Sequence, residues 1–465
     1  MASTESSSPS LALQVSEIAC GATVSFASPQ AKGEREESGA TRNDPPQARG
    51  EGKEGAHWRA VAAASIGNVF EWFDFIIYGF FAAMIARLFF PAGNEAASFL
   101  LTFASFGVTF VMRPFGAVVM GDLADRHGRK AALTLSISMM TAGTAITAFA
   151  PTYASIGIFG PILVVAARMI QGFSAGGEFG SATVFLAEQN PEQRGLYASW
   201  QFAGQGLSTV LATGLGAALN GLLTAEQMEV WGWRMPFLFG LLIGPIGCYI
   251  RRHADETLEF RSAQTTSGPL WETFSWGKTR LLVAIGTIVL VTVAAYTAVY
   301  MPTYAVRELG LPPVGAFLAT MLAGAIQVVM IPLFGALSDK LGRLPIATIA
   351  TVAVLITVHP LFAWLVAVPT IKSLLFVEAS VGVSVAAYTG AIPALISELF
   401  PTHLRTTSVS TSYSVGVAIF GGFAPFIIAW LIDATGSNLA PSYYLMFAAA
   451  VSLAALGAAY RLGFR

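Results

Sequence analysis

From Trp58 onward, this chain of 465 residues is a series of long apolar stretches separated by short polar turns. A helix needs about 20 mainly apolar residues to cross the ~30 Å hydrocarbon core of a bilayer. Twelve stretches reach that length, near 59–89, 99–121, 131–150, 157–187, 195–222, 234–250, 280–303, 314–337, 345–367, 373–398, 406–432 and 442–461. With 54% hydrophobic and 11% charged residues, a soluble globule would have too few polar side chains for its surface. We therefore predict an all-α integral membrane protein with twelve transmembrane helices.

Polar segments divide the chain into four predicted parts. Residues 1–57 are rich in Ser, Glu and Gly and have no apolar period, so we expect a disordered cytoplasmic tail. Residues 58–250 and 280–465 would each form a six-helix bundle, and the charged segment 251–279 would connect them on the cytoplasmic side. No basic segment with a compact apolar run and a cleavage site precedes the first span, so we expect no cleaved signal peptide. The two cysteines, in the tail and in a span, suggest neither a disulfide framework nor redox chemistry.

The two halves repeat a short polar loop. Residues 112–130 read Met-Arg-Pro-Phe-Gly-Ala-Val-Val-Met-Gly-Asp-Leu-Ala-Asp-Arg-His-Gly-Arg-Lys. Residues 335–343 read Gly-Ala-Leu-Ser-Asp-Lys-Leu-Gly-Arg. The matching glycines, Gly121 and Gly335, are offset by 214 positions. A second pair of loops, after spans four and ten, recurs at offsets of 210 and 211 residues. The acid and the arginine that bracket these loops are Glu188 and Arg194, and Glu398 and Arg405. Two landmark pairs at nearly one offset indicate an internal duplication, as in many transporters.

Charged groups at the cytoplasmic ends of the spans can form hydrogen bonds that close the inner face and break when it opens. The candidate residues for this cytoplasmic gate are Gly121, Asp122, Asp125, Arg126, Gly128, Arg129, Glu188, Arg194, Asp339, Arg343, Glu398 and Arg405. The alternative is that these charges only anchor helix ends and set the topology. We favour the gate, because topology alone requires neither carboxylates nor particular glycines.

The distribution of Lys and Arg predicts the orientation of the chain. From Lys53 on, sixteen of these residues fall on the side of the N-terminal tail and four on the opposite side. The four are Arg87, Arg234, Arg307 and Lys372, and two more lie within spans. Positive charge accumulates on the cytoplasmic side of membrane proteins. We therefore expect both termini in the cytoplasm and, in a bacterial host, a multi-pass protein of the inner membrane.

Two stretches of the first half resemble signatures of a known family. Residues 67–79, Gly-Asn-Val-Phe-Glu-Trp-Phe-Asp-Phe-Ile-Ile-Tyr-Gly, are similar to the first-span signature of the metabolite:proton symporter branch of the major facilitator superfamily. Residues 168–178, Arg-Met-Ile-Gln-Gly-Phe-Ser-Ala-Gly-Gly-Glu, resemble its fourth-span signature, and the duplicated loops resemble the signature loop of the superfamily. The resemblance implies two six-helix bundles around a midplane cavity and transport by alternating access, coupled to protons.

Three further stretches are similar to citrate and tricarballylate carriers of this branch. They are residues 101–107, 300–304 and 418–425. The resemblance implies import of citrate or a related di- or tricarboxylate. Other members carry 2-oxoglutarate, shikimate or zwitterionic osmolytes, so another such metabolite is the alternative, followed by a nutrient sensor with the carrier fold. Phe73 departs from the family, which usually has an aromatic residue with a hydroxyl there.

The charges within the spans are the candidates for binding and coupling, because an ionised group at the bilayer centre costs at least ~2.5–3.5 kcal/mol. Arginine binds carboxylates through two parallel hydrogen bonds, and a nearby acid takes up a proton when substrate competes for the guanidinium. We predict Glu71, Asp74 and Glu178 as proton-coupling residues, and Arg113, Arg168, Tyr296, Tyr300, Gln327 and Tyr388 as substrate-binding residues. By this reading all charges within spans lie in the first half, and the second half adds neutral polar groups.

Two structural alternatives stand beside these roles. Arg113 would instead form a permanent bridge with Glu71 or Asp74. The glycines of span four, Gly172, Gly176, Gly177 and Gly180, permit close helix packing whatever Glu178 does.

The sequence lacks the motifs of several other classes of protein. It has no nucleotide-binding loop, no metal-ligand spacing and no nucleophile–base pattern, so we expect no enzyme, no cofactor and no bound metal. The expected partners are an organic anion, protons and the lipid bilayer, without nucleic acid, and we expect function as a monomer.

Overall fold

The computed structural model describes residue 65 and residues 68–127, 129–176, 178–245 and 277–464. The side chains of residues 121–122, 124–127, 129–133 and 403 are not part of this description. The predicted tail, most of the predicted connector and therefore the exact limits of the two bundles lie outside the described residues.

The described first half consists of helices joined by short turns. They are Asn68–Phe80, α3 (Ala82–Phe89), α4 (Glu95–His127), α5 (Arg129–Phe149), α6 (Tyr153–Ile156), α7 (Phe159–Ala175), α8 (Glu178–Gln189), α9 (Arg194–Leu222), α10 (Ala225–Val230), the 3-10 helix η1 (Gly232–Arg234) and α11 (Met235–Gly240). The helix Asn68–Phe80 and α3 form one predicted span, which bends by 65° at its break.

The second half also consists of helices joined by short turns. They are α15 (Lys278–Arg307), α16 (Pro313–Leu341), α17 (Arg343–Ala367), α18 (Ile371–Glu398), α19 (Thr402–Gly416), the π-helix η2 (Val417–Gly421), α20 (Ala424–Thr435) and α21 (Ala440–Arg461). Four of them, α15 to α18, contain an internal proline. The segment α19–η2–α20 corresponds to one predicted span, which changes its helical pitch in the middle.

Nine stretches within the described residues are long and apolar enough to cross a membrane, and the bent pair at the start of the chain makes a tenth. In span three, the segment Thr134–Phe149 of α5 is a shorter apolar helix, and α11 lies in the described part of span six. A helix therefore occupies every predicted span, and no strand occurs among the described residues. The predicted all-α membrane fold is confirmed.

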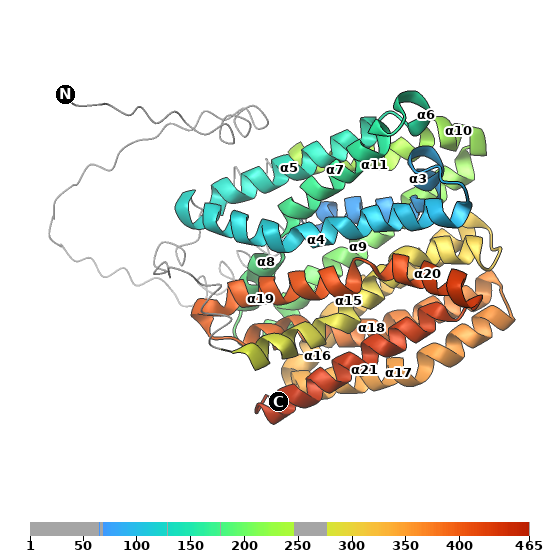
Figure 1. Ribbon diagram of the computed structural model, residues 1–465. Coiled ribbons are helices and arrows are strands. Elements are labelled where there is room, and N and C mark those ends of the chain that lie inside the picture. The colour runs from blue at the N-terminus through green and yellow to red at the C-terminus, as the bar shows by residue number, and fades with distance from the viewer. Residues whose placement is uncertain (1–64, 66–67, 128, 177, 246–276, 465) are drawn as a thin grey trace, which may run out of the picture.

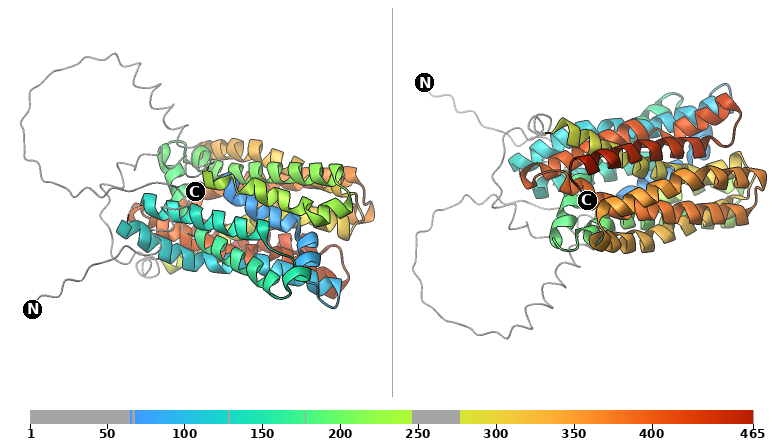
Figure 2. Two further views of the ribbon diagram at one scale, coloured as in Figure 1. Left: turned by 90° about the horizontal axis from the view of Figure 1, so that it is seen from above. Right: turned by 90° about the horizontal axis from the view of Figure 1, so that it is seen from below.

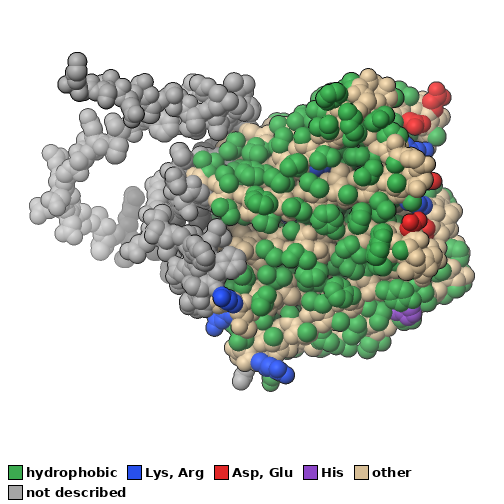
Figure 3. Space-filling view, in the orientation of Figure 1, with side chains coloured by type: hydrophobic (Ala, Val, Ile, Leu, Met, Phe, Trp, Pro, Cys, Tyr) green, Lys and Arg blue, Asp and Glu red, His purple; other side chains and the backbone are tan. Residues whose placement is uncertain are grey.

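The helices lie nearly parallel, with those of the first half gathered on one side and those of the second half on the other (Figures 1 and 2). Hydrophobic side chains cover the middle of the face in Figure 3, and charged side chains concentrate near its two ends. This pattern suits a bilayer, because the hydrocarbon core offers no partner for charged groups.

Glycines bring the two halves into close contact where α9 packs along α16. A Cβ on Gly335 would lie 2.5 Å from the carbonyl oxygen of Gly195, and one on Gly206 would lie 3.0 Å from that of Gly324. Such spacing leaves no room for a side chain, so backbone packs directly on backbone. Near the opposite ends of these helices, the ring of Phe317 on α16 lies 2.8 Å from a Cβ on Gly216 of α9.

Glycines also tighten the first half internally, where α4 crosses α7. A Cβ on Gly172 would collide with the carbonyl oxygen of Thr109, and one on Gly176 would collide with that of Arg113. This contact fits the packing role expected for the span-four glycines, of which Gly177 lies outside the described residues. The close approach carries Arg168, one turn before Gly172, toward the first span.

We predict that Gly172→Ala lowers the stability of the protein. Overpacking of a filled interior costs about 1–3 kcal/mol, more than the gain of up to about 1 kcal/mol from replacing a helical glycine by alanine. The measurement is the midpoint of thermal unfolding of the purified protein in detergent. Gly457→Ala is the matched control, because nothing lies within 4 Å of a Cβ at that helical position. Equal midpoints for the two variants would contradict the packing argument.

Candidate functional site

A buried ion pair in the first half joins Asp74 to Arg168 of α7. The side chains are 2% and 0% exposed, and Nη1 of Arg168 donates to Oδ2 of Asp74 at 3.2 Å. The same carboxylate accepts hydrogen bonds from Nε2 of Gln171 at 2.7 Å and from Oγ1 of Thr144 at 2.8 Å. The guanidinium of Arg168 also lies 4.3 Å from the ring centroid of Tyr78. The negative charge of Asp74 is therefore fully compensated by donors within the first half.

Glu71 contacts a different helix from Asp74, although the two lie three residues apart on one helix. Its Oε1 is 4.0 Å from Nη2 of Arg113 on α4, an ion-pair distance that is too long for a hydrogen bond. Glu71 and Asp74 thus form ion pairs with two different arginines, Arg113 and Arg168. Of the two bridges considered for Arg113 from the sequence, the structure has the one with Glu71.

Arg113 is buried but incompletely hydrogen-bonded. Its side chain is 2% exposed, and its Nε and Nη2 atoms have no hydrogen-bond partner within the described part of the chain. The guanidinium lies among aromatic rings, with centroids at 5.7 Å for Trp72, 4.9 Å for Phe75 and 4.8 Å for Phe110. Aromatic faces attract the charge but supply no acceptor in the plane of the guanidinium. Arg113 therefore retains donors that a carboxylate could engage.

The second half supplies two tyrosines to the surroundings of Arg113. Tyr296 of α15 stacks on Trp72 with centroids 5.7 Å apart, and its hydroxyl has no partner among the described residues. Tyr413 of α19 lies close to both Arg113 and Glu71. We name Glu71, Trp72, Arg113, Tyr296 and Tyr413 the central site. It is built from both halves, so their relative movement would change it.

The other predicted site residues lie outside the central site. Glu178 accepts a hydrogen bond of 3.3 Å from Ser136 of α5. Tyr300 packs edge-on against Phe103 at 5.5 Å, while the hydroxyl of Tyr388 donates to the carbonyl of Thr287 at 2.6 Å. Gln327 lines a separate cavity in the second half. The structure thus brings Glu71, Arg113 and Tyr296 together and places Arg168 with Asp74.

The structure corrects the expectation that all charges within spans belong to the first half. Glu378 of α18 is 6% exposed and accepts a hydrogen bond of 2.8 Å from Thr320 of α16. A signal for it was present in the sequence. Glu378 follows Arg168 by 210 residues, the offset that separates Glu188 from Glu398, so the duplication itself points to this position.

At the helix ends on the predicted cytoplasmic side, charged groups join the two halves. Nη1 of Arg405 donates to Oε1 of Glu188 at 2.7 Å. The carboxylate of Asp339 accepts from the backbone N–H groups of Gly195 and Leu196, at 2.8 and 3.0 Å. These contacts link α19 to α8 and α16 to α9.

Arg343 connects two acids of the second half at the same end. Its Nη1 lies 2.7 Å from Asp339, and its Nη2 lies 3.4 Å from Glu398. Arg194 begins α9 beside this network. For the other gate candidates, Gly121, Asp122, Asp125, Arg126, Gly128 and Arg129, the side chains or the whole residue lie outside the described part of the chain.

At the opposite ends of the helices, the two halves meet through aromatic side chains. Phe80 packs edge-on against Phe317 at 5.7 Å, and the guanidinium of Arg307 lies 4.4 Å from the ring centroid of Phe99. Next to this contact, burial raises the pKa of Glu308, an effect that the ion pair with Arg307 partly opposes. Contacts between the halves therefore exist at both ends, with the central site between them.

We predict that Asp74→Asn destabilises the protein by about 3–5 kcal/mol, because it leaves Arg168 buried without its counter-charge. Removing both charges in the double variant Asp74→Asn/Arg168→Gln should cost less than the sum of the single changes. Thermal unfolding in detergent measures these effects. Asp433→Asn, at an exposed position of α20, is the control. A variant at Asp74 as stable as this control would show that the pair contributes little.

Comparison with known proteins identifies a family and several relatives that match most of this chain. The sequence model described as Major Facilitator Superfamily matches residues 64–411 and 283–464. The chain is 37% identical over 411 residues to a citrate-proton symporter of Klebsiella pneumoniae, covering 88% of this chain and 93% of the relative. It is 33% identical over 413 residues to the glycine betaine/proline/ectoine/pipecolic acid transporter OusA of Dickeya dadantii, covering 85% and 81%.

A solved structure of a D-xylose-proton symporter has a similar fold. Its TM-score is 0.69, with 17% sequence identity over 84% of this chain and 96% of the solved chain. At this identity the likeness concerns the fold alone.

Proposed function

Since this chain belongs to the Major Facilitator Superfamily and is a multi-pass membrane transporter rather than an enzyme, we propose that it imports an organic carboxylate together with protons by alternating access. The proposed substrate is citrate or a related di- or tricarboxylate. The relatives of 37% and 38% identity are both named citrate-proton symporters, which supports this choice.

The observation that carries the proposal is the incompletely bonded guanidinium of Arg113. A buried donor without an acceptor costs about 1–3 kcal/mol, and more for a charged group. A carboxylate that enters the central site would supply acceptors for Nε and Nη2 in the paired geometry that arginine favours. The hydroxyl of Tyr296, which also lacks a partner within the described residues, would add a donor from the second half.

Glu71 is placed to couple this binding to a proton. Its carboxylate lies 4.0 Å from Arg113, so a substrate carboxylate on the guanidinium would compete with it. A buried acid that loses its cationic neighbour takes up a proton. Asp74 would follow the same logic with Arg168, but its three donors bind it more firmly.

The second candidate substrate is a zwitterionic osmolyte. The aromatic rings in and next to the central site are those of Trp72, Phe75, Phe110 and Tyr296. Aromatic faces bind quaternary ammonium groups. Relatives named as proline/betaine transporters are 32–34% identical to this chain. The carboxylate of a zwitterion would still engage Arg113, so the two candidates differ in what the rings contact.

The inner contacts described above are our proposed cytoplasmic gate. They would break when the cavity opens to the cytoplasm, with the two bundles 58–250 and 280–465 moving as units. With the gate on the cytoplasmic side, both termini would also lie in the cytoplasm. A monomer would suffice for transport, because the residues of the central site all come from one chain.

Uptake into proteoliposomes under an inward proton gradient tests the proposed function. We expect gradient-dependent uptake of labelled citrate that is abolished by a protonophore and inhibited more by tricarballylate than by betaine. Arg113→Gln should raise the half-saturating concentration by about 30-fold or more, since losing charged hydrogen bonds in a buried site costs at least ~2 kcal/mol. Arg113→Lys should also bind weakly, because a lysine lacks the planar pair of donors.

Arg461→Gln, at the exposed end of α21, is the control for these variants. Uptake of betaine without citrate would replace the proposed substrate by the second candidate. No flux of any tested metabolite would favour a sensor and contradict import.

The gate makes a separate prediction. Glu188→Gln should raise the rate at which an impermeant maleimide labels a cysteine placed at Ser199, a buried position of α9 near Gly335, by about two- to fivefold. The rate is measured from the cytoplasmic side in a background without the two native cysteines. The exchange Glu188→Arg/Arg405→Glu should restore slow labelling. Glu192→Gln, exposed in the same loop, should change nothing, and an equal rise there would exclude a specific pair.

A further inference from the structure

The second half contains a buried acid without a nearby base. Glu378 is 6% exposed, and Oγ1 of Thr320 donates to its Oε1 at 2.8 Å. No ion pair of Glu378 occurs within the described part of the chain. An ionised carboxylate in such surroundings is costly, so the protonated acid is the form that these surroundings tolerate.

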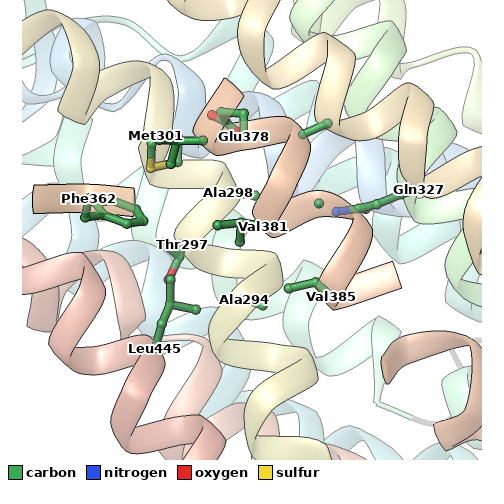
Figure 4. A pocket seen from close by; sticks show the side chains of 13 residues that line it. Ala294, Thr297, Ala298, Met301, Gln327, Phe362, Glu378, Val381, Val385 and Leu445 are labelled. Atoms are coloured by element: carbon green, nitrogen blue, oxygen red, sulfur yellow. The ribbon is translucent and has the colours of Figure 1, made fainter. Parts of the chain in front are cut away.

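Glu378 borders a small cavity of about 40 Å³ within the second half (Figure 4). One water molecule occupies at least about 10–15 Å³ of such a cavity, so there is room for two or three water molecules. The residues that face it from the other helices are Thr297 and Met301 of α15, Gln327 of α16, Phe362 of α17 and Leu445 of α21. None of these groups titrates near neutral pH, which leaves Glu378 as the ionisable group of the cavity.

An unpartnered hydroxyl marks the cavity as a place for a hydrogen-bonding ligand. Thr297 is 3% exposed, and its Oγ1 has no hydrogen-bond partner among the described residues. Buried polar groups are nearly always satisfied by protein or by ordered water. Water in the cavity would satisfy Thr297 and could also reach the amide of Gln327 and the carboxyl of Glu378.

The position of Glu378 relates it to the ion pair of the first half. By the 210-residue offset it is the counterpart of Arg168, which is paired with Asp74. Seven residues separate Glu378 from Ile371 at the start of α18, about 10 Å along the helix axis. Equivalent spans of the two bundles thus carry a buried charged pair in one and a lone acid in the other.

We propose that Glu378 and this cavity form a second proton-binding site, located inside the second bundle and separate from the central site. A hydronium ion in the cavity would transfer its proton to the carboxylate of Glu378 and leave water behind. The reverse transfer would release the proton when the second bundle rearranges and water enters. The inference rests on the proposed function, in that this proton would move together with the substrate.

Infrared spectroscopy of the full-length protein in lipid vesicles tests the site without any substrate. We expect the C=O band of a protonated carboxylic acid at neutral pH, lost in Glu378→Gln and shifted in the shorter acid Glu378→Asp. Glu229→Gln is the matched control, because it removes an exposed carboxylate of α10 and should leave the band unchanged. A band that survives in Glu378→Gln would overturn the proposal.

Transport then tests whether the proton is coupled. Glu378→Gln should keep substrate exchange at equal pH on both sides within about twofold. Its maximal accumulation under a gradient of one pH unit should fall about tenfold, the factor that one proton contributes. Unchanged accumulation would make Glu378 a static acid and overturn the proposal. Absence of flux in the unmodified protein would defeat the proposed function instead, and the infrared result alone would then decide this inference.

Discussion

Charges in this fold must find their partners inside the protein, because the surrounding hydrocarbon provides none. Asp74 and Arg168 meet this condition as an almost fully buried ion pair, and Thr144 and Gln171 donate further hydrogen bonds to the carboxylate. The pair ties the first span to α7, and the glycine contact of α7 with α4 brings Arg113 close to the same region. The position of the central site thus depends on how the first bundle neutralises its own charges.

The two bundles solve this problem differently. Within the described residues, two arginines of the first bundle each lie opposite an acid, whereas the corresponding span of the second bundle has Glu378 where the first has Arg168. The two bundles have corresponding spans, yet their interiors differ in charge. Under the proposed function, the first bundle would attract the anion through Arg113, while the second bundle would contribute the hydroxyl of Tyr296 to the central site and hold Glu378 at a separate cavity.

The sequence predicted the fold well because the bilayer imposes a simple rule on length and polarity. The twelve spans and the loop pairs with Glu188 and Arg405 follow from local composition and from the repeat. The site was harder to predict. Glu71 and Asp74 share a helix face by their spacing, but their side chains reach different helices, and only the tertiary structure shows this. The contacts of Tyr300 with Phe103 and of Tyr388 with the carbonyl of Thr287 are likewise visible only in the tertiary structure.

The contact of Asp339 with the start of α9 has a consequence for how the sequence can vary at this end of the helices. Its donors are the backbone amides of Gly195 and Leu196, which every residue except proline possesses. The helix macrodipole adds positive potential at the same place and attracts the carboxylate without any side chain. The hydrogen-bonding chemistry of these donors is therefore independent of their side chains. Gly195 is still constrained by space, because a Cβ there would collide with the carbonyl oxygen of Gly335. Natural variation that abolishes the contact must therefore fall on the acid itself or on the close approach of the two helices at Gly195.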